Sequence, residues 1–155
     1  MNYYKIQSDI LKLLVQQKNG PCLAPASADH DPIMSDGKFL AVIPKEKCFL
    51  SVTNPKQAVT ALHDFLNDFY NPRYNYLLAK RKYQLNAKPA CSNKTIPVER
   101  LDSENATAYV AVKYLKYFDS DACYYIHSRK ALVYVMEHDI LVGAICPVNI
   151  IEEDT

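Results

Sequence analysis

Two stretches of the chain resemble each other and constrain what it can fold into. Residues 36–44 read Asp-Gly-Lys-Phe-Leu-Ala-Val-Ile-Pro, and residues 138–147 read His-Asp-Ile-Leu-Val-Gly-Ala-Ile-Cys-Pro. The first begins with Asp36-Gly37, a strong turn signal, and continues into an apolar run of strand length. Self-similarity of this kind indicates an internal duplication, with the two stretches as equivalent strands of two related units.

The last third of the chain has the clearest pattern of elements. It predicts a strand at residues 95–101, a helix at 105–118 and three strands at 123–127, 131–137 and 140–146. The order of this unit is βαβββ.

The first third can be read in the same order. It predicts a strand at residues 3–7, a helix that begins after the capping residue Ser8 and ends at Asn19-Gly20-Pro21, an edge strand at 32–34, and a hairpin of 39–43 with 48–52. The sequence therefore predicts an α+β fold of two tandem βαβββ units.

The middle of the chain connects these units. Asn54-Pro55 is typical of a helix start and Asn71-Pro72 of a helix end, and residues 73–93 are read as a further helix followed by a loop. We expect a single domain over 1–155, with subdomains at 1–53 and 95–150 joined by a helical basic segment at 54–94 that adds an extra central helix.

Composition narrows the class of protein. The apolar fraction of 49% is typical of a globular domain, and no apolar run reaches the roughly 20 residues that a bilayer crossing needs. The N-terminal residues lack a secretory signal pattern, and the five cysteines are scattered without a Cys-x-x-Cys pair. We expect a cytoplasmic protein with no metal, no cofactor and no membrane partner; self-association stays open.

A family resemblance enters through the C-terminal residues. Val112-Lys113-Tyr114-Leu115 begins the predicted helix, a hairpin follows, and residues 144–150 read Ala-Ile-Cys-Pro-Val-Asn-Ile. Over roughly the last 50 residues this resembles the last unit of bacterial DNA sliding clamps, the rings that hold replicative polymerases on DNA. The resemblance implies a clamp-like fold, a role at DNA or a replication protein, and protein contacts through Pro147, Val148 and Ile150.

Charge and tyrosine content indicate a second kind of surface. No acidic residue lies between Asp68 and Glu99, where Tyr74, Tyr76 and Tyr83 alternate with basic residues, and the chain holds 12 Tyr and no Trp. This composition suits contact with nucleic acid through the cations, or with protein through the tyrosines, and it equally suits a solvated charged face. The candidate nucleic-acid ligands are Arg73, Lys80, Arg81 and Lys82.

Two constellations could carry catalysis. Cys123 and His127 share one face of a predicted strand, which could pair a thiol with an imidazole, and Asp29-His30-Asp31 could hold an acid–base histidine or a metal. Inert packing and a solvated loop explain the same residues more simply, and no Gly-rich phosphate loop or Gly-x-Ser-x-Gly motif is present.

The sequence thus favours a non-enzymatic binding module of sliding-clamp-like fold that acts on DNA or a replication protein. The first alternative is a small phage or mobile-element inhibitor that docks on a host protein. The second is a hydrolase that uses Cys123 and His127.

Overall fold

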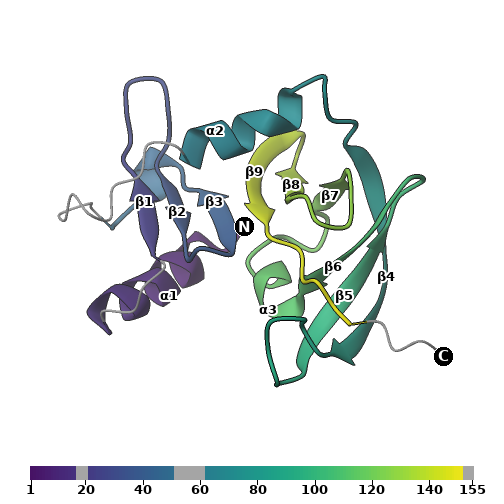
Figure 1. Cartoon of the computed structure of the whole chain (residues 1–155). Helices are drawn as coiled ribbons and strands as arrows, with labels where there is room; N and C mark the ends of the chain where they lie inside the picture. The colour runs from purple at the N-terminus through teal and green to yellow at the C-terminus, as the bar shows by residue number, and fades with distance from the viewer. Residues whose placement is uncertain (17–20, 51–61, 152–155) are drawn as a thin grey trace.

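The computed structural model describes residues 1–16, 21–50 and 62–151. Its strands form one antiparallel sheet of nine in the order β1-β2-β3-β9-β8-β7-β4-β5-β6, with few helices, so the α+β class is confirmed (Figure 1). The strands are β1 Cys22–Ala24, β2 Ile33–Ser35, β3 Phe39–Val42, β4 Leu77–Ala87, β5 Ile96–Asp102, β6 Thr107–Ala111, β7 Cys123–Ile126, β8 Val133–Glu137 and β9 Ile140–Ile145. The helices are α1 Tyr3–Val15, α2 Leu62–Asn67 and α3 Val112–Leu115, with 3-10 turns at Lys45–Lys47 and Asp68–Tyr70.

The two similar sequence stretches lie side by side at the middle of this sheet. They form β3 and β9, which pair antiparallel with Phe39 opposite Ile145 and Leu40 opposite Ala144. Around this pair the chain repeats one order of elements, α1-β1-β2-β3 and α3-β7-β8-β9, so that β1 and β7 take the outer places of a six-strand stretch. The two stretches are therefore equivalent in element order.

The start of the first unit differs from its expected structure, because residues 3–7 are helical and not a strand. The Asn2 side chain caps α1 by accepting a hydrogen bond from the Lys5 N–H at 3.0 Å. Ile6 and Ile10 are both buried, one helical turn apart. The helix therefore begins directly after Asn2, and the order of elements in the first unit is αβββ.

The predicted helix at 105–118 is also wrong over its first half. Residues 107–111 form β6, which pairs with β5 and is almost wholly buried, and only α3 follows. Short apolar runs of this kind fit a strand or a helix equally well until a partner strand is available. The described elements consequently give αβββ and ββαβββ in place of two βαβββ units.

Residues 77–87 of the basic segment form one long strand, β4, contrary to the helix predicted in residues 73–93. The first residues of β4 pair with β7 and its remainder pairs with β5, with a bulge between Arg81 and Gln84. Two partner strands satisfy its backbone along almost its whole length, which outweighs local helix propensity. This strand therefore connects β7 with β5 within one sheet.

Residues 48–50 do not extend the predicted hairpin. The buried Gln7 side chain accepts hydrogen bonds from the N–H groups of Phe49 (2.8 Å) and Leu50 (3.3 Å), so these donors need no partner strand. The predicted helix start at Asn54-Pro55 lies outside the described residues, whereas α2 confirms the later part of that helix.

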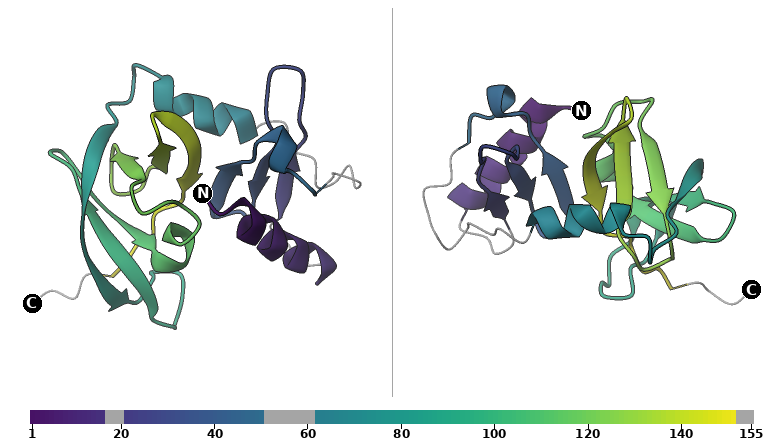
Figure 2. Two further views of the ribbon diagram at one scale, coloured as in Figure 1. Left: turned by 180° about the vertical axis from the view of Figure 1, so that it is seen from behind. Right: turned by 90° about the horizontal axis from the view of Figure 1, so that it is seen from above.

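The chain after β9 covers the far edge of the sheet. Val148 donates its N–H to the Tyr109 carbonyl of β6 at 2.7 Å, Ala90 donates to the Asn149 carbonyl at 2.7 Å, and Ile150 bridges to Pro89. The chain after β9 thereby connects the two ends of the six-strand stretch β9-β8-β7-β4-β5-β6, while α2 lies on the other side of the molecule from α3 (Figure 2). Over the described residues, no helix is both long and apolar enough to cross a membrane.

Candidate functional site: two binding pockets at the β3–β9 junction

An aromatic pocket of about 530 Å³ opens between α2 and the sheet. We call it the aromatic pocket because six ring-bearing residues line it: Phe39 from β3, Phe65 from α2, Tyr74 and Tyr76 from the segment before β4, His127 after β7, and Tyr134 from β8. Leu40, Leu62 and Leu132 add aliphatic surface. Its volume and apolar lining are those of a ligand-binding cleft.

Several rings of this pocket pack against one another. His127 lies 5.4 Å from both Tyr74 and Tyr76, and Tyr76 meets Tyr134 edge-on at 4.8 Å between centroids. The Tyr134 hydroxyl donates a hydrogen bond to the Phe65 carbonyl at 2.5 Å, which ties α2 to the sheet. Burial raises the pKa of Tyr76 and Tyr134, so both phenols stay neutral at physiological pH. Because the rings contact one another and Tyr134 binds the Phe65 carbonyl, the pocket is formed without a ligand.

Apolar side chains also surround the mouth of the aromatic pocket. Among its lining residues, Phe65 is 49% exposed and Tyr74 39%. Asp68 is its acidic lining residue, and no lysine or arginine lines it within the described chain. An exposed apolar rim of this kind is typical of an interaction site.

A second cavity, of about 590 Å³, lies on the other side of the β3–β9 junction. We call it the lysine groove, because Lys38, Lys113 and Lys116 line it together with the apolar residues Ile96, Val112 and Val148. Lys38 comes from the turn before β3, Lys113 from α3, and Lys116 from the residue that ends α3. Gly37 and Cys146 line both cavities.

The acidic group beside the lysine groove is already engaged. Asp36 accepts hydrogen bonds from the Lys38 N–H at 2.8 Å and from the Tyr114 hydroxyl at 2.8 Å. Among the residues that the structure describes, none of the three lysines forms an ion pair with a carboxylate. Lys113 lies 4.8 Å above the Tyr114 ring. Three lysines and no carboxylate line the groove among the described residues, and the nearby Asp36 offsets only part of their charge.

Of the four predicted nucleic-acid ligands, Arg81 is engaged by an acidic residue. Arg81 makes a two-pronged contact with the buried Glu99 and lies over the Tyr124 ring at 5.7 Å. Burial alone would raise the pKa of Glu99, but the hydrogen bonds from Arg81 and Gln84 lower it. Arg73, Lys80 and Lys82 are all exposed, and Lys80 is in register with Asp102 of β5.

The predicted protein-binding residues divide among three places. Tyr74 and Tyr76 line the aromatic pocket, whereas Pro147 and Val148 line the lysine groove. Tyr83 lies elsewhere and accepts a hydrogen bond from Arg100 at 3.3 Å, and Ile150 is buried.

The structure separates the two residues of the predicted thiol–imidazole pair. Cys123 begins β7 and His127 follows its end, so four residues of extended chain, about 13 Å, lie between them. Cys123 is exposed, whereas His127 packs on Tyr74 and Tyr76. This spacing does not suit a nucleophile and its base, which need direct hydrogen-bond contact.

The Asp29-His30-Asp31 loop packs against α2. The His30 ring lies 4.5 Å from the His63 ring, and Asp31 accepts a hydrogen bond from the Lys45 N–H at 3.2 Å. Burial and the neighbouring His30 lower the pKa of His63. The loop thus contributes to the docking of α2, a contact that sequence spacing did not reveal.

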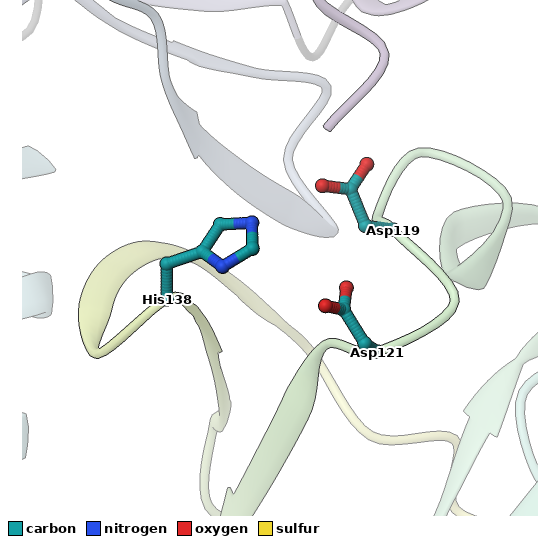
Figure 3. Close-up of side chains that lie close together, drawn as sticks. All are labelled: Asp119, Asp121 and His138. Carbon is teal, nitrogen blue, oxygen red and sulfur yellow. The ribbon is translucent and has the colours of Figure 1, made fainter.

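One exposed cluster could hold a metal ion, and sequence reasoning missed it. Ligand atoms of Asp119, Asp121 and His138 lie within 4.8 Å of one another, and Figure 3 shows the side chains directed toward a common space. Asp119 is also bound to the Met1 amino group at 2.5 Å, whose hydrogen bond lowers the pKa of that carboxyl. The Met1 ammonium group therefore already neutralises part of this cluster.

Comparisons with protein-family models, with curated proteins and with solved structures find no match to this chain.

Proposed function

We propose that the protein is a non-enzymatic binding module that docks on a partner protein by taking an aromatic or branched aliphatic side chain of the partner into the aromatic pocket. The observation that carries this proposal is a preformed, ring-lined cavity with an exposed apolar rim. Pockets of this kind receive the buried anchors that dominate interface energies.

The distribution of charge favours protein over nucleic acid as the occupant. The aromatic pocket presents Asp68 and no lysine or arginine among the described residues, so a phosphate gains no electrostatic attraction there. Arg81, the central cation of the predicted nucleic-acid surface, is engaged by Glu99. The tyrosines of the basic segment therefore matter more than its charges.

The repeated αβββ order and the β3–β9 pair support an origin by duplication, as the resemblance to sliding clamps implies. On that resemblance the partner is a replication protein. In the alternative, the same pocket lets a phage-type inhibitor dock on a host protein. Both require the same chemistry at the pocket.

A random 12-residue peptide library displayed on phage tests the proposal. We expect selection on the whole chain to enrich peptides that share one aromatic or large aliphatic position. Their affinity for a Tyr74→Ala variant should fall about tenfold or more, since truncation of an aromatic hot-spot residue costs about 2 kcal/mol.

Tyr83→Ala is the matched control, because Tyr83 is also an exposed tyrosine of the basic segment but does not line the pocket. Selection that enriches no sequence, or peptides that bind wild type, Tyr74→Ala and Phe65→Ala equally, would show that the pocket is not a docking site.

A further inference from the structure

The lysine groove has a chemistry that protein docking at the aromatic pocket does not use. Three exposed lysines from two separate parts of the chain line one cavity, Lys38 before β3 and Lys113 with Lys116 at α3. The nearby Asp36 carboxylate is occupied by Tyr114 and by backbone N–H groups. Three lysines against one nearby carboxylate give the cavity an excess of positive charge, which favours a negatively charged ligand.

The ligand must also have a part that is not charged. Ile96, Val112 and Val148 give the groove an apolar lining, and such a surface gains free energy when an uncharged ring or chain covers it. A bare inorganic anion would leave this lining exposed to water.

A polar donor lies at the same cavity. The Ser92 hydroxyl oxygen accepts a hydrogen bond from the Lys94 N–H at 3.1 Å, and its own proton remains available to donate. A hydroxyl beside several lysines matches the multiple acceptor oxygens of a phosphate chain. A single carboxylate has only two oxygens and one charge and would leave most of these donors unused.

We propose that the lysine groove binds a nucleotide, with its phosphates at Lys38, Lys113 and Lys116 and its nucleoside against the apolar lining. The nucleotide is either free or the phosphorylated end of a nucleic-acid strand, because both present the same groups. This site is independent of the aromatic pocket, and its ligand is a small or terminal group and not a protein surface.

Isothermal titration calorimetry of the whole chain at about 50 mM salt, where Debye screening is weak, provides the test. The probes are ATP, tripolyphosphate, adenosine and a 5′-phosphorylated 12-residue oligothymidylate. We expect ATP or the oligonucleotide to bind more tightly than tripolyphosphate and adenosine. The tighter of the two identifies the source, and affinity should fall as salt is raised.

The variant Lys113→Gln/Lys116→Gln should weaken binding by about tenfold for each lysine removed, the worth of one charge-assisted hydrogen bond. The control Lys12→Gln/Lys130→Gln removes the same charge from exposed residues that do not line the groove. All four positions are exposed, so both variants should fold, which a thermal melt verifies. Absence of binding by ATP and oligonucleotide, equal effects of the two double variants, or adenosine binding as tightly as ATP would each overturn the proposal.

Discussion

The aromatic pocket and the lysine groove share two lining residues, Gly37 and Cys146, yet differ in their charge and in their share of aromatic side chains. Six ring-bearing residues and the carboxylate of Asp68 line the former, whereas three lysines and several aliphatic side chains line the latter. Neighbouring residues of β3 contribute to this difference: Leu40 lines the aromatic pocket, whereas Ala41 belongs to the main core together with Ile6 of α1 and Tyr114 of α3. One strand junction can thus carry two sites of unlike chemistry.

The two sites also differ in what holds them. The aromatic pocket depends on α2, which the Tyr134 hydroxyl ties to the sheet. The lysine groove depends on α3, whose Leu115 packs into the main core and is only 6% exposed. A change to α2 or to α3 should therefore weaken binding at one site only. A change to the shared β3–β9 junction should weaken binding at both sites.

The largest effect is expected from Leu115→Ala, which should lower the free energy of unfolding by about 2–5 kcal/mol because it leaves a cavity beneath α3. Nucleotide affinity should fall more than peptide affinity. Denaturant melts measure the stability, and Leu11→Ala, a half-exposed leucine of α1, serves as the control with a change near 0.5 kcal/mol or less. A change that small for Leu115→Ala would mean that α3 does not pack as described.

Gly143→Ala tests the shared junction. A Cβ at this position would clash with the Leu40 carbonyl oxygen and press on the Phe118 ring at 3.2 Å. Backbone cannot yield as a flexible side chain does, so we expect a loss of about 3 kcal/mol, the upper part of the range for overpacking. Binding of both ligands should weaken together when titrations are compared with wild type. A loss confined to one ligand would contradict the shared junction.

Tyr134→Phe should have a smaller effect, limited to the aromatic pocket. It removes the hydrogen bond to the Phe65 carbonyl, so α2 should be less firmly held and stability should fall by about 1 kcal/mol. Peptide affinity should fall and nucleotide affinity should not, as fluorescence polarisation with each labelled ligand would show. Tyr83→Phe is the control. Equal stability and equal peptide affinity of the two variants would argue against a role of the Tyr134 hydrogen bond in holding α2.

The smallest effect concerns pH. The folded pKa of His63 lies below its unfolded value of 6.5, because burial and His30 disfavour the charged form. Its contribution to stability is therefore fully present above pH 6.5 and is lost as pH falls through the folded pKa. Peptide affinity at the aromatic pocket should decline between pH 7 and pH 5, and a His63→Gln variant should flatten that profile. Asp64 favours the charged form of His63 and so opposes the lowering of its pKa. A steeper pH dependence of peptide affinity in the variant would show that another group controls the profile.

The sequence was most informative where its signal was local and repeated. The similar stretches at 36–44 and 138–147 identified β3 and β9, and alternation with turn signals identified β5, β7 and β8 closely. Tyr74 and Tyr76 were chosen as protein-binding residues because aromatic side chains suit interfaces, and both line the aromatic pocket.

What the sequence could not predict depends on contacts between distant residues. Residues 107–111 are a strand because β5 lies beside them, and residues 48–50 remain irregular because the Gln7 side chain takes their N–H groups. Lys38 joins Lys113 and Lys116 through contacts between distant residues, such as the hydrogen bond from Tyr114 to Asp36, so the lysine groove leaves no motif in the chain. Arg81 looked like a free cation because its partner Glu99 belongs to another strand.

The claim that one junction carries two independent sites is tested most directly by crossing the two variants with the two ligands. Peptide and nucleotide titrations would be run on wild type, on Tyr74→Ala and on Lys113→Gln/Lys116→Gln. We predict that Tyr74→Ala weakens only the peptide and that the lysine variant weakens only the nucleotide, each by about tenfold or more. If either variant weakened the binding of both ligands equally, or weakened the binding of neither, the assignment of two separate sites would be contradicted.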